Sequence, residues 1–161
     1  MVDMAKISKT NVMRVLDKNK ISYEIHTYEA SDGKIDGMSV AAKVGRPPED
    51  LFKTLVTKGE SGDYFVFVVC VADELDLKKS AASVGEKAVH MIPVADINRV
   101  TGYIRGGCSP IGMKKPFQTV IDKKAQGNIV VSAGKIGMQV EVSAKELADL
   151  IGATFSDIHM S

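Results

Sequence analysis

Residues 66–72 carry an apolar side chain at every position. An unbroken run of this kind, without polar alternation, is typical of a strand that is buried on both faces of a sheet. A β-rich segment at 51–57 precedes it, and the turn-forming residues Glu-Ser-Gly-Asp at 60–63 separate the two. The pattern therefore predicts a β-hairpin whose second strand lies inside a sheet.

The other predicted elements mix helices and strands without a regular β-α-β rhythm. The clearest helix is the last, where Ser143 and Glu146 form a capping box and Gly152 ends the apolar stripe. Ser8 is predicted as the N-cap of the first helix. We expect helices near 8–19, 38–44, 77–84, 93–99 and 143–151, and further strands at 21–25, 89–92, 118–121, 128–132 and 138–142. This order favours an α+β fold with a mixed sheet curled into an open, barrel-like core.

The chain of 161 residues shows no internal repeat, low-complexity stretch or linker. We expect a single domain over residues 1–161, with its core at about 8–158. Its start is too polar for a secretory signal, and no apolar run approaches the roughly 18 residues of a membrane span, so we expect a cytoplasmic protein. Cys70 and Cys108 stand far apart, which argues against a disulfide framework or a thiolate metal site.

The net charge of +1 predicts that any nucleic-acid partner is held through few phosphates. The lysine pairs at 78–79, 114–115 and 123–124 are candidates for such contacts, or are solvated surface lysines. His26, His90 and His159 show no metal-binding spacing, and no P-loop or G-x-S-x-G motif is present. We therefore expect neither a metal centre nor a serine-hydrolase triad.

Lys53 is anomalous for its place in the hairpin. It shares one face of the predicted strand 51–57 with Leu51 and Leu55. If that face lines a core or cleft, the ammonium needs an anionic or carbonyl partner. The alternative is an edge lysine whose stem covers apolar neighbours while its head reaches water.

Two glycine-rich stretches are not linker-like. Residues 101–112 contain Gly106 and Gly107, which permit backbone conformations closed to other residues and let a ligand approach the chain closely. Successive amides there can form an anion-binding nest or an oxyanion hole, although a tight turn without a ligand explains the glycines equally well. The second stretch, 132–137, is compatible with a simple hairpin turn. Neither stretch identifies a reaction.

Six segments resemble, in order and spacing, those of the YbaK/EbsC family, the stand-alone relatives of the editing domain in many bacterial prolyl-tRNA synthetases. The segments read I-H-T-Y, F-K-T-L, L-D-L-K-K, T-G-Y, G-G-C-S-P-I-G and S-A-G-K, at 25–28, 52–55, 75–79, 101–103, 106–112 and 132–135. The resemblance covers about residues 11–158. It implies an open, barrel-like α/β fold without a metal or a tightly bound cofactor.

The resemblance also implies a site. Lys53 matches the family's essential side chain, and the glycine loop matches the pocket for the aminoacylated adenosine. Cys108 stands where relatives carry isoleucine, valine or threonine, and is interpreted as a small buried residue, with a reactive thiol as the alternative. The implied substrate-binding residues are Tyr28, Gly106, Gly107, Cys108, Ser109, Pro110, Ser132 and Gly134.

The implied activity is removal of cysteine from mischarged Cys-tRNA(Pro), often in company with prolyl-tRNA synthetase. The resemblance implies that the thiol of the attached cysteine acts as the nucleophile, which explains why the protein shows no nucleophilic side chain of its own. Two alternatives stay open on the sequence. One is an Ala-tRNA(Pro) deacylase that uses water, and the other is a non-catalytic module that binds tRNA or a synthetase.

Overall fold

The computed structural model describes residues 8–161, which form an α+β fold of two sheets and five α-helices. The larger sheet is mixed, with strand order β4-β2-β3-β5-β8. β2 pairs antiparallel with β3 and β4, whereas β5 runs parallel to β3 and β8. These strands are β2 (Phe52–Gly59), β3 (Tyr64–Cys70), β4 (Val89–Met91), β5 (Gln118–Asp122) and β8 (Thr154–Ser156).

β3 occupies the centre of this sheet and is buried from Phe65 to Cys70. The predicted hairpin is confirmed, because β2 and β3 pair from Phe52 opposite Cys70 to Lys58 opposite Tyr64. β8 was not predicted from the sequence, although β4, which is equally short, was.

The smaller sheet is antiparallel, with order β1-β7-β6. It comprises β1 (Glu24–Thr27), β6 (Asn128–Lys135) and β7 (Met138–Ser143). A single parallel bridge, Leu51 to Val130, links it to the larger sheet. The expected single curled, barrel-like sheet is therefore wrong. β3 pairs along one edge of β2, and β4 pairs with residues 57–59 on the other edge. Among the described residues, the bridge from Leu51 to Val130 is the one backbone pairing between this part of the chain and β6.

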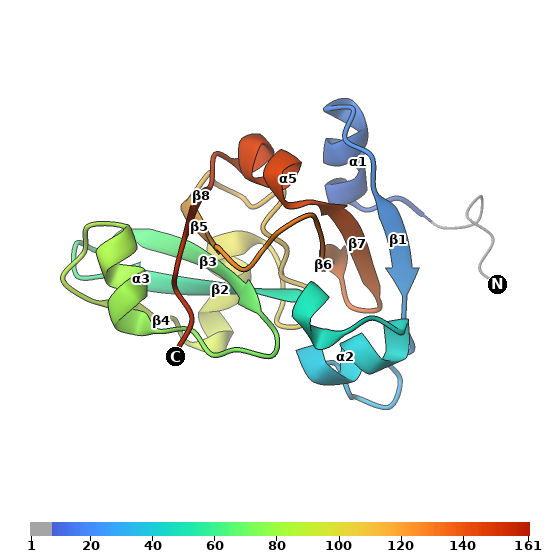
Figure 1. Ribbon diagram of the computed structural model, residues 1–161, viewed down its shortest axis with the longest axis horizontal. Coiled ribbons are helices and arrows are strands. Elements are labelled where there is room, and N and C mark those ends of the chain that lie inside the picture. The colour runs from blue at the N-terminus through green and yellow to red at the C-terminus, as the bar shows by residue number, and fades with distance from the viewer. Residues whose placement is uncertain (1–7) are drawn as a thin grey trace.

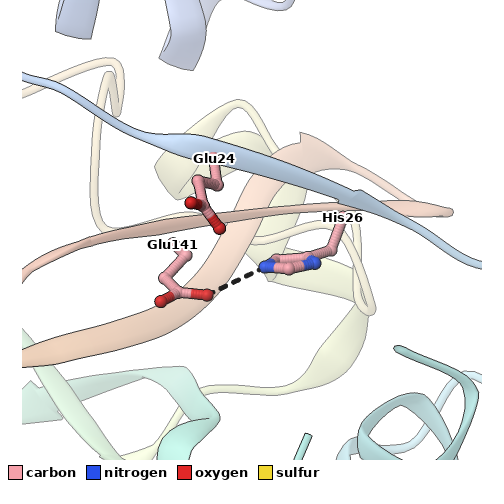
Figure 2. Close-up of side chains that lie close together, drawn as sticks. All are labelled: Glu24, His26 and Glu141. Atoms are coloured by element: carbon pink, nitrogen blue, oxygen red, sulfur yellow. Dashed lines mark hydrogen bonds and ion pairs between the residues drawn. The ribbon is translucent and has the colours of Figure 1, made fainter. Parts of the chain in front are cut away.

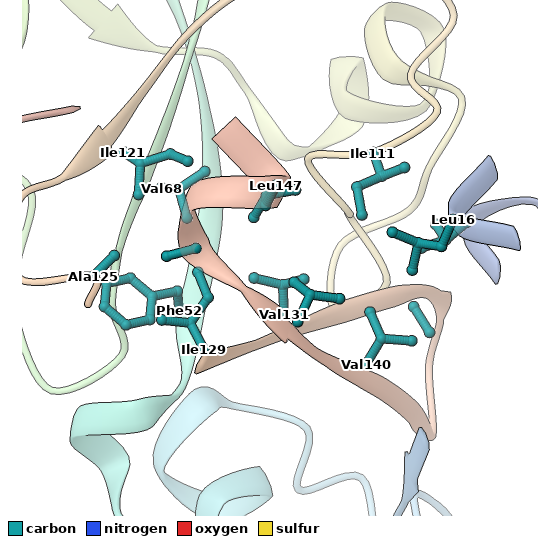
Figure 3. Packing of buried hydrophobic residues seen from close by; sticks show 14 of the residues in the cluster. Leu16, Phe52, Val68, Ile111, Ile121, Ala125, Ile129, Val131, Val140 and Leu147 are labelled. Carbon is teal, nitrogen blue, oxygen red and sulfur yellow. The ribbon is translucent and has the colours of Figure 1, made fainter. Parts of the chain in front are cut away.

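The two sheets are not connected by a continuous hydrogen-bond ladder. They are held together by the packing of their side chains. One buried cluster contains Phe52 and Val68 of the larger sheet together with Val131 and Val140 of the smaller one (Figure 3). Leu147 and Leu16 add side chains from α5 (Ala144–Ile151) and α1 (Asn11–Lys18), which lie beside the smaller sheet in Figure 1.

Three further α-helices belong to the described structure. They are α2 (Gly37–Val44), α3 (Leu77–Ser83) and α4 (Ile97–Thr101), with 3-10 turns at Pro48–Asp50 and Val94–Asp96. The helix expected at 93–99 is thus a 3-10 turn followed by α4. None of the described helices is long and apolar enough to cross a membrane.

Two predicted helix caps have different outcomes. The hydroxyl of Ser143 accepts a hydrogen bond from the amide of Glu146, as expected (3.3 Å). The first helix is capped by Thr10 and not by Ser8, because it is the Thr10 hydroxyl that accepts a bond from the amide of Met13.

Candidate active site

A cavity of about 820 Å³ lies against β2, along the edge that carries no strand partner between the Leu51 bridge and the pairing with β4. Residues 51–56 line it from one side. The beginning of α2, the segment 91–97, the glycine loop and the β6–β7 pair complete the wall. The topology thus leaves an unpaired strand edge and encloses it as a pocket of the size used for small ligands.

Lys53 is half-buried and lines this cavity. Within residues 8–161 its ammonium makes no hydrogen bond and no ion pair. The carboxylate among the lining residues is Asp36, which accepts bonds from the amide (3.1 Å) and hydroxyl (2.7 Å) of Ser39 as the N-cap of α2. The cavity therefore offers a cation that an anionic ligand can satisfy.

The first half of the glycine loop forms part of the cavity wall through Gly106 and Cys108. Gly107 is buried behind it, and its amide donates to the Ile104 carbonyl at 3.0 Å. The amide of Gly107 is therefore engaged in a turn. The amides of Gly106 and Cys108 have no acceptor within the described part of the chain, so both are unpaired donors on residues that line the cavity.

The second half of the loop is buried. The hydroxyl of Ser109 accepts a bond from the amide of Ile111 at 3.3 Å, and Tyr103 donates to the Ile111 carbonyl at 2.5 Å. Ser109 and Pro110 are buried and do not line the cavity. Gly134 does not line it either: a Cβ there would lie 3.0 Å from the Tyr103 ring.

Ser132 lines the cavity from β6, and its hydroxyl accepts a bond from the amide of Gly134 at 3.1 Å. Opposite it on β7, Gln139 lines the same cavity with 8% of its surface exposed. The side-chain amide of Gln139 makes no hydrogen bond within residues 8–161. Sequence reasoning missed this residue, although its alternation with Met138 and Val140 was the available signal.

Tyr28 lies behind the cavity wall. Its ring packs with Val40, Leu51 and Val130, and of these Val40 and Leu51 line the cavity while Tyr28 does not. The buried hydroxyls of Tyr28 and Thr54 find no hydrogen-bond partner among the described residues. Thr54 is a cavity-lining residue that the sequence did not single out, and its hydroxyl is buried. Leaving such a group unsatisfied costs about 1–3 kcal/mol.

Cys108 is not an activated nucleophile. Burial raises the pKa of its thiol to about 11, so the thiol stays protonated at neutral pH. Burial likewise raises the pKa of Tyr103 to about 12. Neither group is therefore ionised near pH 7. Cys108 is half-buried and lines the cavity, so it is not the fully buried residue that was expected, and its inertness stays a prediction.

Comparison with known proteins identifies the family. The family model for the aminoacyl-tRNA editing domain matches residues 36–150. A protein of Enterococcus faecalis that carries the provisional name Cys-tRNA(Pro)/Cys-tRNA(Cys) deacylase EbsC is 43% identical over 152 residues, covering 93% of each chain. The chain belongs to the YbaK/EbsC family of aminoacyl-tRNA editing domains.

Solved structures share this editing-domain fold. A protein provisionally described as a trans-editing enzyme for prolyl-tRNA synthetase superposes with a TM-score of 0.81 at 23% identity, covering 96% of this chain and all of that one. A hypothetical protein superposes with a TM-score of 0.85 at 18% identity, covering 94% of this chain and all of that one. At such identities the likeness concerns the fold alone.

Two groups of side chains outside the cavity wall of this editing domain have the composition of a metal site. In the first, His26 and Glu141 share a hydrogen bond of 2.9 Å beside Glu24 (Figure 2), and Arg46 pairs with the same Glu141 oxygen. Arg46 also donates to Asp50 at 2.9 Å, at the end of the 3-10 turn that precedes β2. The cation already neutralises Glu141, so the cluster fits a link between the sheets better than a metal centre.

The second group, Asp122, Asp157 and His159, is also partnered. His159 contacts the fully buried carboxylate of Asp122 at 2.5 Å, and Lys79 donates to Asp157 at 3.3 Å. This group fastens the C-terminal segment to β5 and α3, away from the cavity. The lysine pairs that were candidates for RNA contacts are partly engaged in the same way, since Lys124 pairs with Asp73 at 2.9 Å.

Proposed function

We propose that this protein is a trans-acting deacylase of mischarged Cys-tRNA(Pro), and that the whole chain 1–161 acts as one editing domain in the cytoplasm. The observation that carries the proposal is the Lys53 ammonium, which has no partner among residues 8–161, on the wall of an 820 Å³ cavity in a chain 43% identical to EbsC. Editing is needed because an apolar synthetase pocket separates amino acids of similar size, such as cysteine and proline, only weakly.

The proposed chemistry uses the substrate's own sulfur. The cysteine thiolate attacks the ester carbonyl carbon, the bond from that carbon to the ribose oxygen breaks, and the ribose oxygen takes up a proton. The products are free tRNA and a cyclic thioester, which water then opens to cysteine. Holding the two reacting atoms together can lower the barrier by roughly 7–11 kcal/mol at best.

The residues around the cavity supply a positive charge and hydrogen-bond donors for this reaction. Lys53 stabilises negative charge on the thiolate, whose free pKa is about 8.5, or on the developing oxyanion. The free amides of Gly106 and Cys108 and the side chain of Gln139 orient the ester. Because the pKa of Cys108 is about 11, the protein itself supplies no thiolate that could compete with the substrate.

The partner in this proposal is the 3′ end of aminoacylated tRNA, with prolyl-tRNA synthetase nearby. A net charge of +1 leaves few phosphates to neutralise, so we expect weak binding of tRNA and a shallow dependence on salt. A synthetase that already holds the tRNA raises its effective concentration at the cavity. If purified synthetase neither stimulates nor associates with the protein, this part of the proposal is wrong.

The test is a side-by-side assay on Cys-tRNA(Pro), Ala-tRNA(Pro) and Pro-tRNA(Pro). We expect rapid release of cysteine and little release of alanine or proline. Preferential release of alanine would favour the water-based alternative, and no release at all would favour a non-catalytic binding module. Cys-tRNA(Cys) belongs in the same assay, because the name of EbsC includes it.

A further inference from the structure

Two cations line the cavity without a counter-ion in the described structure. Lys53 stands on β2, and Arg105 stands on the glycine loop, where it is exposed. Neither forms an ion pair within residues 8–161, and the lining carboxylate, Asp36, is engaged as a helix cap. The proposed chemistry uses only the charge of Lys53, so the charge of Arg105 on the cavity wall has no role in it.

The backbone holds Arg105 in a defined place. The amide of Gly107 donates to the Ile104 carbonyl, so Arg105 and Gly106 are the two central residues of a tight turn. Gly106 has a φ of +85°, which is the second central position of a type II turn. Ile35 lies against Gly106, and the backbone of Lys135 and Ile136 lies against Gly107, so the turn is enclosed on two sides.

An exposed guanidinium on a fixed turn suits a phosphate. Arginine presents a planar fork of donors that matches phosphate oxygens, and it stays charged at any relevant pH. The substrate class of this cavity carries one phosphodiester next to the terminal adenosine. Because Arg105 lies on the exposed loop while Lys53 is half-buried, the two cations can meet different parts of that ligand.

We infer that Arg105 binds the phosphate that joins the terminal adenosine to the preceding nucleotide. This leaves Lys53 for the aminoacyl ester. The inference rests on the proposed function and deepens it, because it separates recognition of the RNA backbone from the chemistry. It also identifies a substrate-binding residue that neither the motifs nor the net charge indicated.

The experiment compares two substrates that differ in this phosphate, Cys-tRNA(Pro) and 3′-cysteinyl-adenosine. For Arg105→Ala we expect kcat/KM on the tRNA to fall about tenfold, mainly through KM, and the phosphate-free nucleoside to react as with the wild type. Arg105→Lys should restore part of the loss. Lys53→Ala should slow both substrates. The salt slope of tRNA binding should become shallower by about 0.7 in Arg105→Ala.

Arg99→Ala serves as the matched control, because Arg99 is an exposed arginine on α4 that does not line the cavity. It should change neither substrate. Equal loss on both substrates in Arg105→Ala would show that the loop, and not a phosphate contact, was disturbed, and unchanged kinetics on tRNA would also overturn the inference. If the wild type deacylates neither substrate, the proposed function itself has failed.

Discussion

Replacing Gly106 by alanine tests whether the glycine loop is held against the cavity as the structure shows. Gly106 has a φ of +85°, and a Cβ added there would lie 2.7 Å from Cδ1 of Ile35. The left-handed backbone alone costs a non-glycine residue about 1–2 kcal/mol. Displacing the end of Ile35 adds about 1 kcal/mol, the low end for overpacking, since that side chain is flexible. We therefore expect Gly106→Ala to lower the free energy of unfolding by about 2–3 kcal/mol.

Gly62→Ala is the control for the backbone effect. Gly62 has a similar φ of +93°, in the turn between β2 and β3, and a Cβ there would meet no atom within 4 Å. Only the backbone cost applies, so we expect a loss of about 1–2 kcal/mol. In thermal unfolding, 1 kcal/mol corresponds to a shift of about 2–4 °C for a chain of this size. Gly106→Ala should thus melt lower than Gly62→Ala by at least that interval.

The two variants should differ more in activity than in stability. Ile35 and Arg105 both line the cavity beside Gly106, so a shifted loop should reduce kcat/KM on Cys-tRNA(Pro) about tenfold or more. Gly62→Ala should retain wild-type kinetics at a temperature where both variants are folded. Equal melting temperatures and equal kinetics in the two variants would refute the packing of Gly106 against Ile35.

The remaining predictions concern the chemistry. Lys53→Ala should keep the fold, checked by circular dichroism, and lose at least about tenfold in deacylation, about 1.4 kcal/mol; full activity would remove Lys53 from the mechanism. Ser-tRNA(Pro) should react far more slowly than Cys-tRNA(Pro), because a serine hydroxyl is protonated at neutral pH; comparable rates would exclude attack by the substrate sulfur. EDTA should leave activity unchanged if the tRNA stays folded, and loss restored by a divalent ion would contradict this. Burial raises the pKa of Cys108 to about 11, so the native state keeps a proton that the unfolded state releases near pH 9, and stability should fall as pH rises from about 9 to 11. Cys108→Ala should make that fall shallower in denaturant titrations, and an unchanged slope would mean that Cys108 does not titrate in this way.

Periodicity and caps predicted most of the local elements, although β8 was missed and the first helix is capped by Thr10 and not by Ser8. The unbroken apolar run at 66–72 predicted a strand buried on both faces, and β3 is that strand, because its neighbours β2 and β5 place it inside the sheet. Ser143 and Gly152 bounded α5 correctly, since caps depend on residues a few positions apart. The motifs around Lys53 and Gly106 were also local, so the family could be recognised before the fold was known.

The tertiary structure decided how the strands pair and which residues line the cavity, and local sequence patterns carry no information on either. Whether the strands formed one curled sheet or two depended on which edge of β2 was left unpaired, and pairing over long sequence separations leaves no mark in a single segment. The cavity beside this unpaired edge is lined by Gln139, Thr54 and Arg105. Tyr28, Ser109 and Gly134 lie outside its lining. The sequence by itself determined most of the elements, the motif residues and the family, because each depends on neighbours along the chain. Only the folded structure determined which polar side chains share the cavity without a partner, because that depends on which strands meet.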